Sequence, residues 1–76
     1  MTTKPRRLAK FVLCLNNRGY AASLSVRHLY EQLADEAGES RGLVRVVDES
    51  GEDYLFPRKL FTPLELPVAV RRRLTT

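Results

Sequence analysis

Two β-prone segments separated by a short polar turn constrain this chain more than any other feature. The segments are residues 43–47 and 53–56, which are rich in the β-branched and aromatic side chains that favour strands. Between them lie polar residues and Gly51, which can adopt the positive φ that a tight connection often needs. The pattern predicts a β-hairpin, and an isolated hairpin is not stable in water, so further strands must pair with it.

Two other segments are predicted to supply strands. Residues 9–15 are apolar except for Lys10, which is typical of a strand covered on both faces, and a turn follows at 16–19. Residues 61–66 form another strand, and Pro63 marks it as an edge strand because proline cannot donate a ladder hydrogen bond.

The residues between the hairpin and the last strand predict a short helical turn. Pro57 should end the second hairpin strand, since it has no backbone N–H. Residues 58–60 are then too few for more than one tight turn.

The segment 24–37 is compatible with two structures. Helical spacing relates four of its side chains, Val26, Leu29, Tyr30 and Leu33. Read with a period of two, the same residues form a strand, and the hairpin needs such a partner. We therefore expect a strand from residue 24 to about residue 33 and a helical turn over 35–39, with helix over 26–37 as the open alternative.

Length and composition indicate one small globular domain over residues 1–76. The chain is 43% hydrophobic and 29% charged, unlike a disordered segment, and 76 residues can build only one modest core. We place that core at about 8–66 and expect a basic tail or a short helix at 67–76, where Pro67 suits the first helical position.

Charge is unevenly distributed along the chain. The net charge is +4, the acidic residues gather in the middle, and basic residues gather near both ends. Because chain termini often lie close together in small domains, these basic residues are candidate contacts for the phosphates of a nucleic acid: Arg6, Arg7, Lys10, Arg71, Arg72 and Arg73. The alternative is two solvated tails.

No motif of a catalytic or metal site emerges from the sequence. Cys14 is the single cysteine and is expected to be a buried thiol, while His28 is expected at or near the surface without an oriented partner. The carboxylates of the 48–53 segment lack the spacing of a calcium loop and are interpreted as a solvated turn: Asp48, Glu49, Glu52 and Asp53. We expect no enzyme activity and no cofactor.

Targeting signals and membrane spans are not predicted. The apolar run 11–15 is shorter than the core of a secretory signal, and no run approaches the roughly 18 to 20 apolar residues that a spanning helix requires. We expect a cytoplasmic protein with no membrane partner.

The order of the expected elements resembles a known fold class. Strand, long loop, strand, hairpin, single helical turn and strand is similar to the small five-stranded barrel of the Src homology 3-like class. Residues 42–57 also resemble a stretch in short uncharacterised bacterial proteins of that shape. The resemblance implies a mainly β fold, a five-stranded antiparallel barrel with a helical turn before the last strand, and no activity.

The same resemblance bears on ligands. Signalling members of the class bind proline-rich peptides on a groove containing tryptophan, and this chain has no Trp, so that recognition is not expected. In the class, the long first loop borders the ligand groove, which makes Arg18 and Tyr20 candidate ligand contacts. Tyr30 and Tyr54, with Phe56, form a second candidate group, although aromatic residues in strands more often serve packing.

We therefore expect a non-catalytic interaction or accessory module whose partner is another protein. The alternative is a nucleic-acid-binding barrel that uses the basic termini. The sequence does not indicate the oligomeric state.

Overall fold

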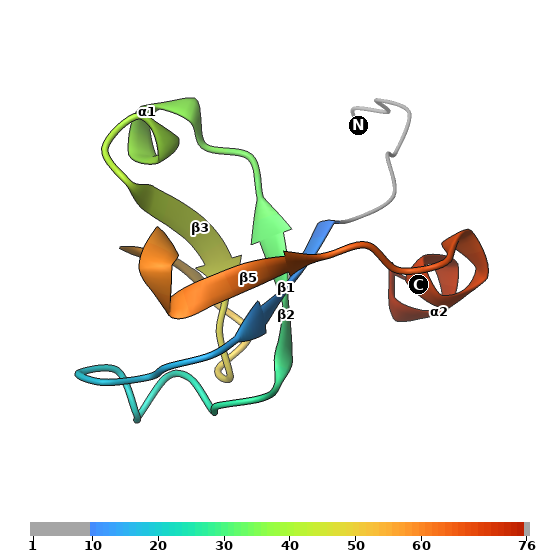
Figure 1. The fold of residues 1–76 in the computed structure, drawn as a ribbon, viewed down its shortest axis with the longest axis horizontal. Helices are drawn as coiled ribbons and strands as arrows, with labels where there is room; N and C mark the ends of the chain where they lie inside the picture. Colours follow the sequence, from blue (N-terminus) through green and yellow to red (C-terminus); the bar gives the residue numbers. More distant parts are fainter. Residues whose placement is uncertain (1–9, 76) are drawn as a thin grey trace.

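The structure, a computed structural model, describes residues 10–75 and is mainly β. Five antiparallel strands form one sheet in the order β4-β3-β2-β1-β5 (Figure 1). Their bounds are β1 Lys10–Cys14, β2 Leu29–Leu33, β3 Leu43–Val47, β4 Asp53–Pro57 and β5 Phe61–Leu64. The predicted class, mainly β with five antiparallel strands, is confirmed, and β4 and β5 are the two edges of an open sheet.

The predicted hairpin is β3–β4. Val44 pairs with Phe56 and Val46 with Tyr54, so these four side chains share one face of the sheet. Gly51 has a φ of 87° in the connecting turn, the conformation that glycine adopts without strain.

The apolar strand β1 lies inside the sheet. It pairs with β2 on one side and with β5 on the other, where Val12 faces Pro63. Pro63 therefore stands on an edge strand, as predicted, and β5 ends at Leu64, two residues earlier than expected. The single helical turn before β5 is present as the 3-10 helix η1, Arg58–Leu60.

The strand expected from residue 24 begins only at Leu29, so that prediction is wrong for residues 24–28. Leu24 is buried at 1% exposure within the β1–β2 loop, and its N–H donates to the Tyr20 carbonyl at 2.9 Å. Arg27 has a φ of 70°, which a strand cannot accommodate. Leu24, whose spacing suggested a strand, instead packs into the core and holds the loop against it.

The second half of the ambiguous segment divides as expected. After β2 comes α1, Glu36–Glu39, with Asp35 as its N-cap: the Asp35 side chain accepts a hydrogen bond from the Gly38 N–H at 2.9 Å. The long helix alternative over 26–37 is wrong, because β2 is held by pairing with both β1 and β3.

The core lies on one face of the sheet. Its members come from all five strands, from the β1–β2 loop and from η1: Val12, Cys14, Leu24, Tyr30, Val44, Val46, Phe56, Leu60 and Phe61. Cys14 is fully buried, as expected.

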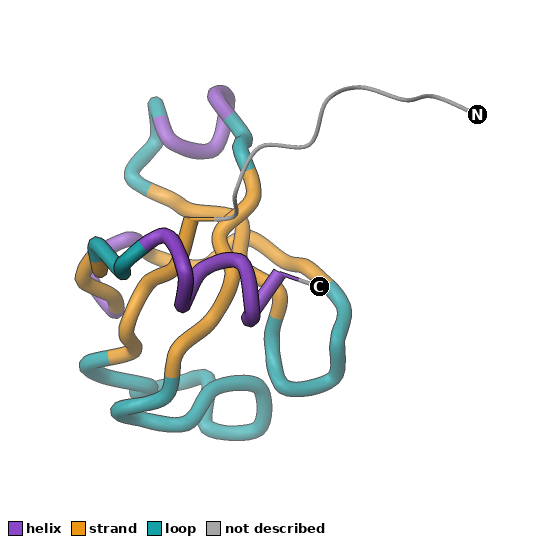
Figure 2. Tube along the Cα trace, turned by 90° about the vertical axis from the view of Figure 1, so that its right-hand side faces the viewer, coloured by secondary structure: helices purple, strands orange, loops and turns teal. Residues whose placement is uncertain are grey.

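The two ends of the sheet carry different structures. Figures 1 and 2 place α1 at one end, and the β1–β2 loop and the β3–β4 turn together at the other. The C-terminal helix α2, Val68–Thr75, lies beyond the end of β5 and exposes Val68, Val70 and Leu74. Within the described residues, no helix has the length and apolar character needed to cross a bilayer.

Candidate ligand pocket

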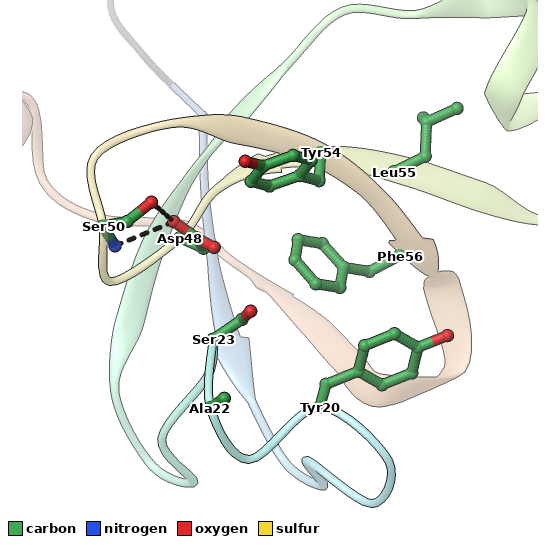
Figure 3. Close-up of a pocket in the computed structure, with 8 residues that line it drawn as sticks. All are labelled: Tyr20, Ala22, Ser23, Asp48, Ser50, Tyr54, Leu55 and Phe56. Atoms are coloured by element: carbon green, nitrogen blue, oxygen red, sulfur yellow. Dashed lines mark hydrogen bonds between the residues drawn. The ribbon is translucent and has the colours of Figure 1, made fainter.

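A pocket opens at the end of the sheet where the β1–β2 loop meets the β3–β4 hairpin. Its volume is about 480 Å³, and Figure 3 shows the side chains around it. The loop, the turn and β4 each contribute to the lining, which we call the aromatic pocket: Tyr20, Ala22, Ser23, Asp48, Ser50, Tyr54, Leu55 and Phe56.

The loop wall of the pocket is fixed by local hydrogen bonds. The Tyr20 N–H donates to the Asn17 carbonyl at 2.7 Å, and the Asn17 side-chain amide donates to the Leu24 carbonyl at 2.9 Å. With Leu24 in the core, these turns leave Tyr20 few positions to occupy. The polar residues and glycine at 16–19 therefore build a specific loop rather than a plain connection.

Aromatic rings form much of the pocket surface. Tyr54 and Phe56 are two residues apart in β4, so their side chains lie on the same face of the strand. Phe56 is buried, whereas Tyr54 is 48% exposed. Tyr20 packs edge-to-face on Phe56, with ring centroids 5.4 Å apart and planes at 79°. The two tyrosines thus flank a buried phenylalanine and remain open to solvent (Figure 3).

Asp48 supplies a buried carboxylate to the same pocket. The prediction of a solvated turn is wrong for this residue, which is only 7% exposed. The reason is tertiary: the β1–β2 loop docks on the turn, where the Glu49 N–H donates to the Ser23 carbonyl at 3.1 Å. Asp48 Oδ1 accepts from the Ser50 hydroxyl at 2.5 Å and from the Ser50 N–H at 2.8 Å.

Hydrogen bonding keeps this carboxylate charged. The Ser50 hydroxyl bond is the largest influence and lowers the pKa of Asp48 below the ordinary value, against the opposing effect of burial. Asp48 is therefore ionised at neutral pH.

Tyr30, a predicted ligand contact, is instead part of the support behind the pocket. It is 6% exposed, its hydroxyl accepts a hydrogen bond from the Ser25 N–H at 2.7 Å, and it donates to Glu49. Burial raises the pKa of Tyr30, and the hydrogen bond from Tyr30 lowers the pKa of Glu49. The His28 side chain is exposed, as expected, but the expectation that it lacks a partner is wrong, because His28 Nδ1 lies 3.4 Å from the same Glu49 carboxylate.

No known protein family, curated protein or solved structure matches this chain. Within residues 10–75, no group of three or more His, Cys, Asp or Glu side chains is placed to hold a metal ion.

The basic residues are only partly brought together. Lys10 at the start of β1 and Arg71 in α2 line a second pocket of about 250 Å³, together with Glu65. Arg72 and Arg73 are exposed on α2, and Arg6 and Arg7 lie outside the described residues. Lys10, near the start of the described residues, and Arg71, near their end, thus line the same pocket beside β1 and β5.

The structure places the remaining predicted site residues in different surroundings. Tyr20 and Tyr54 line one pocket, whereas Arg18 is exposed in the loop outside that lining, with its N–H donating to Asn16 Oδ1 at 2.8 Å. Sequence reasoning missed Ser23 and the pocket role of Asp48. The turn-forming residues Asp48, Ser50 and Gly51 were the available sequence signal for this part of the pocket. They indicate a turn, but they do not indicate which segment packs against it.

Proposed function

We propose that this protein is a non-catalytic protein-interaction module whose partner contacts the aromatic pocket. The observation that carries the proposal is the pair of exposed tyrosines, Tyr20 and Tyr54, around the buried Phe56. Tyrosine offers a large apolar surface with a polar tip and loses little conformational entropy on binding, which is why it is enriched in interfaces. Ligand sites are commonly concave and combine aromatic side chains with a few polar groups, as this pocket does.

We also propose that the fold is a small barrel of the Src homology 3-like class, as found in short bacterial proteins. The long β1–β2 loop, the β3–β4 hairpin and η1 directly before β5 support this assignment. The pocket lining contains no tryptophan, so proline-rich peptides are not proposed as ligands. A cytoplasmic location is part of the proposal, and the lone buried thiol of Cys14 is compatible with it.

The test is a selection of peptides from a random library, followed by mapping of the bound peptides on the backbone amide spectrum. We expect selected peptides to shift the amides of Tyr20, Ser23, Ser50 and Tyr54. Replacing Tyr20 or Tyr54 with Ala should weaken binding about tenfold, the loss typical of an interface aromatic.

A matched control is Leu15→Ala, which shortens an exposed side chain of the same loop outside the pocket. It should bind as the wild type does. Selected peptides that shift only amides elsewhere, or a selection that yields no binder, would overturn the proposal.

Nucleic acid is the second candidate ligand, favoured by Lys10 and Arg71 lining one pocket. Single-stranded RNA and duplex DNA should then shift the amides of these residues, and the shifts should fade as salt rises, since phosphate binding releases counterions. A Lys10→Gln, Arg71→Gln variant should lose the shifts. Absence of any shift at low salt excludes this candidate.

A further inference from the structure

The aromatic pocket combines ring faces with a buried negative charge. Tyr20 packs edge-to-face on the buried Phe56, and the rings of Tyr20 and Tyr54 are the ones exposed to a ligand. The face of an aromatic ring is the negative part of its quadrupole and attracts cations. Asp48, 7% exposed, lies at the turn side of the same space.

The charges around the pocket are complementary to a cation. None of the eight lining residues is Lys or Arg, and Asp48 is the acid among them. Beside the pocket, Glu52 accepts a hydrogen bond from the Tyr54 hydroxyl at 2.7 Å. An anionic group entering here would meet like charge at short range, whereas a cation gains from both the rings and the carboxylate.

The hydrogen bonds of Asp48 distinguish between the two common cationic side chains. Oδ1 already accepts two bonds from Ser50, and Figure 3 shows the other oxygen pointing away from Ser50 into the space beside Ser23, whose hydroxyl also helps to lower the pKa of Asp48. A guanidinium fork binds best to both oxygens of one carboxylate. An ammonium group is a compact charge that needs only one, and it can face two rings at once.

We propose that the aromatic pocket takes a lysine side chain of the partner protein, with its ammonium group facing Asp48 and its methylene groups against the aromatic rings. This inference rests on the proposed function, because it names the group that the interaction module recognises. A volume of about 480 Å³ accommodates such a side chain.

The test is an amide-shift titration with three blocked pentapeptides of one alanine-rich sequence, whose central residue is lysine, Nε-acetyl-lysine or arginine. Acetylation keeps the length of the side chain and removes its charge. We expect the lysine peptide to shift the amides of Ser23, Ser50 and Tyr54, the acetylated peptide to bind about tenfold more weakly, and the arginine peptide to lie between them.

Two variants test the contributions of the Asp48 charge and of the Tyr20 ring. Asp48→Asn keeps an oxygen that can accept the Ser50 bonds but removes the charge, and Tyr20→Leu keeps an apolar side chain but removes a ring face. Each should weaken the lysine peptide severalfold and bring its affinity closer to that of the acetylated peptide in the same variant. Glu36→Gln removes an exposed carboxylate of α1, outside the pocket, and should change neither.

The outcomes separate this inference from the proposed function. Equal binding of the lysine and acetyl-lysine peptides overturns the cation preference, and stronger binding of the arginine peptide overturns the choice of lysine. In both cases, library-selected peptides in the pocket still support an interaction module. If Asp48→Asn does not fold, an unchanged lysine affinity in Tyr20→Leu overturns the inference, and if no peptide of any kind shifts these amides, both proposals fail.

Discussion

The hydroxyl of Tyr30 donates a hydrogen bond to the carboxylate of Glu49, which joins the interior strand β2 to the turn between β3 and β4. The same oxygen accepts a bond from the Ser25 N–H at 2.7 Å, so one buried side chain also holds the β1–β2 loop. The loop and the turn are the two walls of the aromatic pocket. Tyr30 therefore holds the loop and the turn in place relative to each other, although it does not line the pocket itself.

Replacing Tyr30 with Phe should lower the free energy of unfolding by about 1–3 kcal/mol, because the partly buried Ser25 N–H loses its acceptor and Glu49 loses the Tyr30 hydroxyl. Urea unfolding measures the change. Tyr54→Phe, which removes a hydroxyl bonded to the exposed Glu52, is the matched control and should cost clearly less. An equal decrease in the free energy of unfolding in the two variants would show that the Tyr30 hydrogen bonds stabilise the fold no more than the exposed Tyr54 bond does.

Gly38 lies close to the side chain of Leu55. A Cβ on Gly38 would lie 2.7 Å from Leu55 Cδ2, so the end of that side chain must move in a Gly38→Ala variant. Alanine favours a helix over glycine by about 1 kcal/mol, and the displacement of Leu55 opposes this gain. Gly38→Ala should therefore stabilise the protein more in a Leu55→Ala background than in the wild type, as measured by urea unfolding of the single and double variants. The same change of stability in both backgrounds would contradict this contact.

Arg27 is the non-glycine residue with a positive φ in residues 10–75, at 70°. An L-residue in this region loses about 1–2 kcal/mol of conformational energy, and glycine avoids that loss at a smaller entropic cost. Arg27→Gly should therefore raise the free energy of unfolding by about 0.5 kcal/mol. Arg18→Gly, in the same loop with the same change of charge, should lower it, and a loss of stability in both variants would contradict the strain at Arg27.

Acid should destabilise the protein through the turn carboxylates. The Ser50 hydroxyl lowers the pKa of Asp48, and the Tyr30 hydroxyl lowers the pKa of Glu49. The unfolded chain then binds protons first as the pH falls, so the stability that these groups provide is present above their ordinary pKa values of 3.8 and 4.5 and is lost below them.

The measurement is the urea midpoint between pH 6 and pH 3, taken as an approximate range around those carboxylate values. Asp48→Asn keeps the turn acceptor but cannot titrate, so its midpoint should fall less steeply with acid than that of the wild type. A variant curve as steep as the wild-type curve would show that Asp48 does not contribute to acid sensitivity.

Local pattern was sufficient for much of the fold. The β3–β4 hairpin follows from two β-prone runs around Gly51, and the edge position of β5 follows from Pro63, because both are consequences of backbone chemistry within a few residues. The β1–β2 loop was not predictable in the same way. Leu24 and Val26 fit a strand by spacing, and only packing of Leu24 into the core decides that they belong to a loop.

The candidate site depended more strongly on contacts between distant segments. Tyr30 and Tyr54 are both strand tyrosines, and nothing in their neighbours along the chain separates them. Tyr30 is buried where the β1–β2 loop packs against it through Ser25, whereas Tyr54 is exposed although Phe56, which Tyr20 covers, is buried on the same face of β4. The burial of Asp48 has the same origin, since its turn chemistry is local but the loop that covers it begins more than twenty residues earlier.

The sequence by itself determined a small, mainly β chain with a hairpin, an edge strand interrupted by proline and a helical turn before the last strand. These features depend on which φ, ψ and hydrogen bonds each residue permits. Only the tertiary structure decided that Tyr20, Tyr54 and Asp48 share one pocket while Tyr30 lies behind it. The physical reason is that the exposure and charge environment of a residue depend on which segments pack against it. In this protein, the β1–β2 loop is the segment that packs against Tyr30 and the β3–β4 turn.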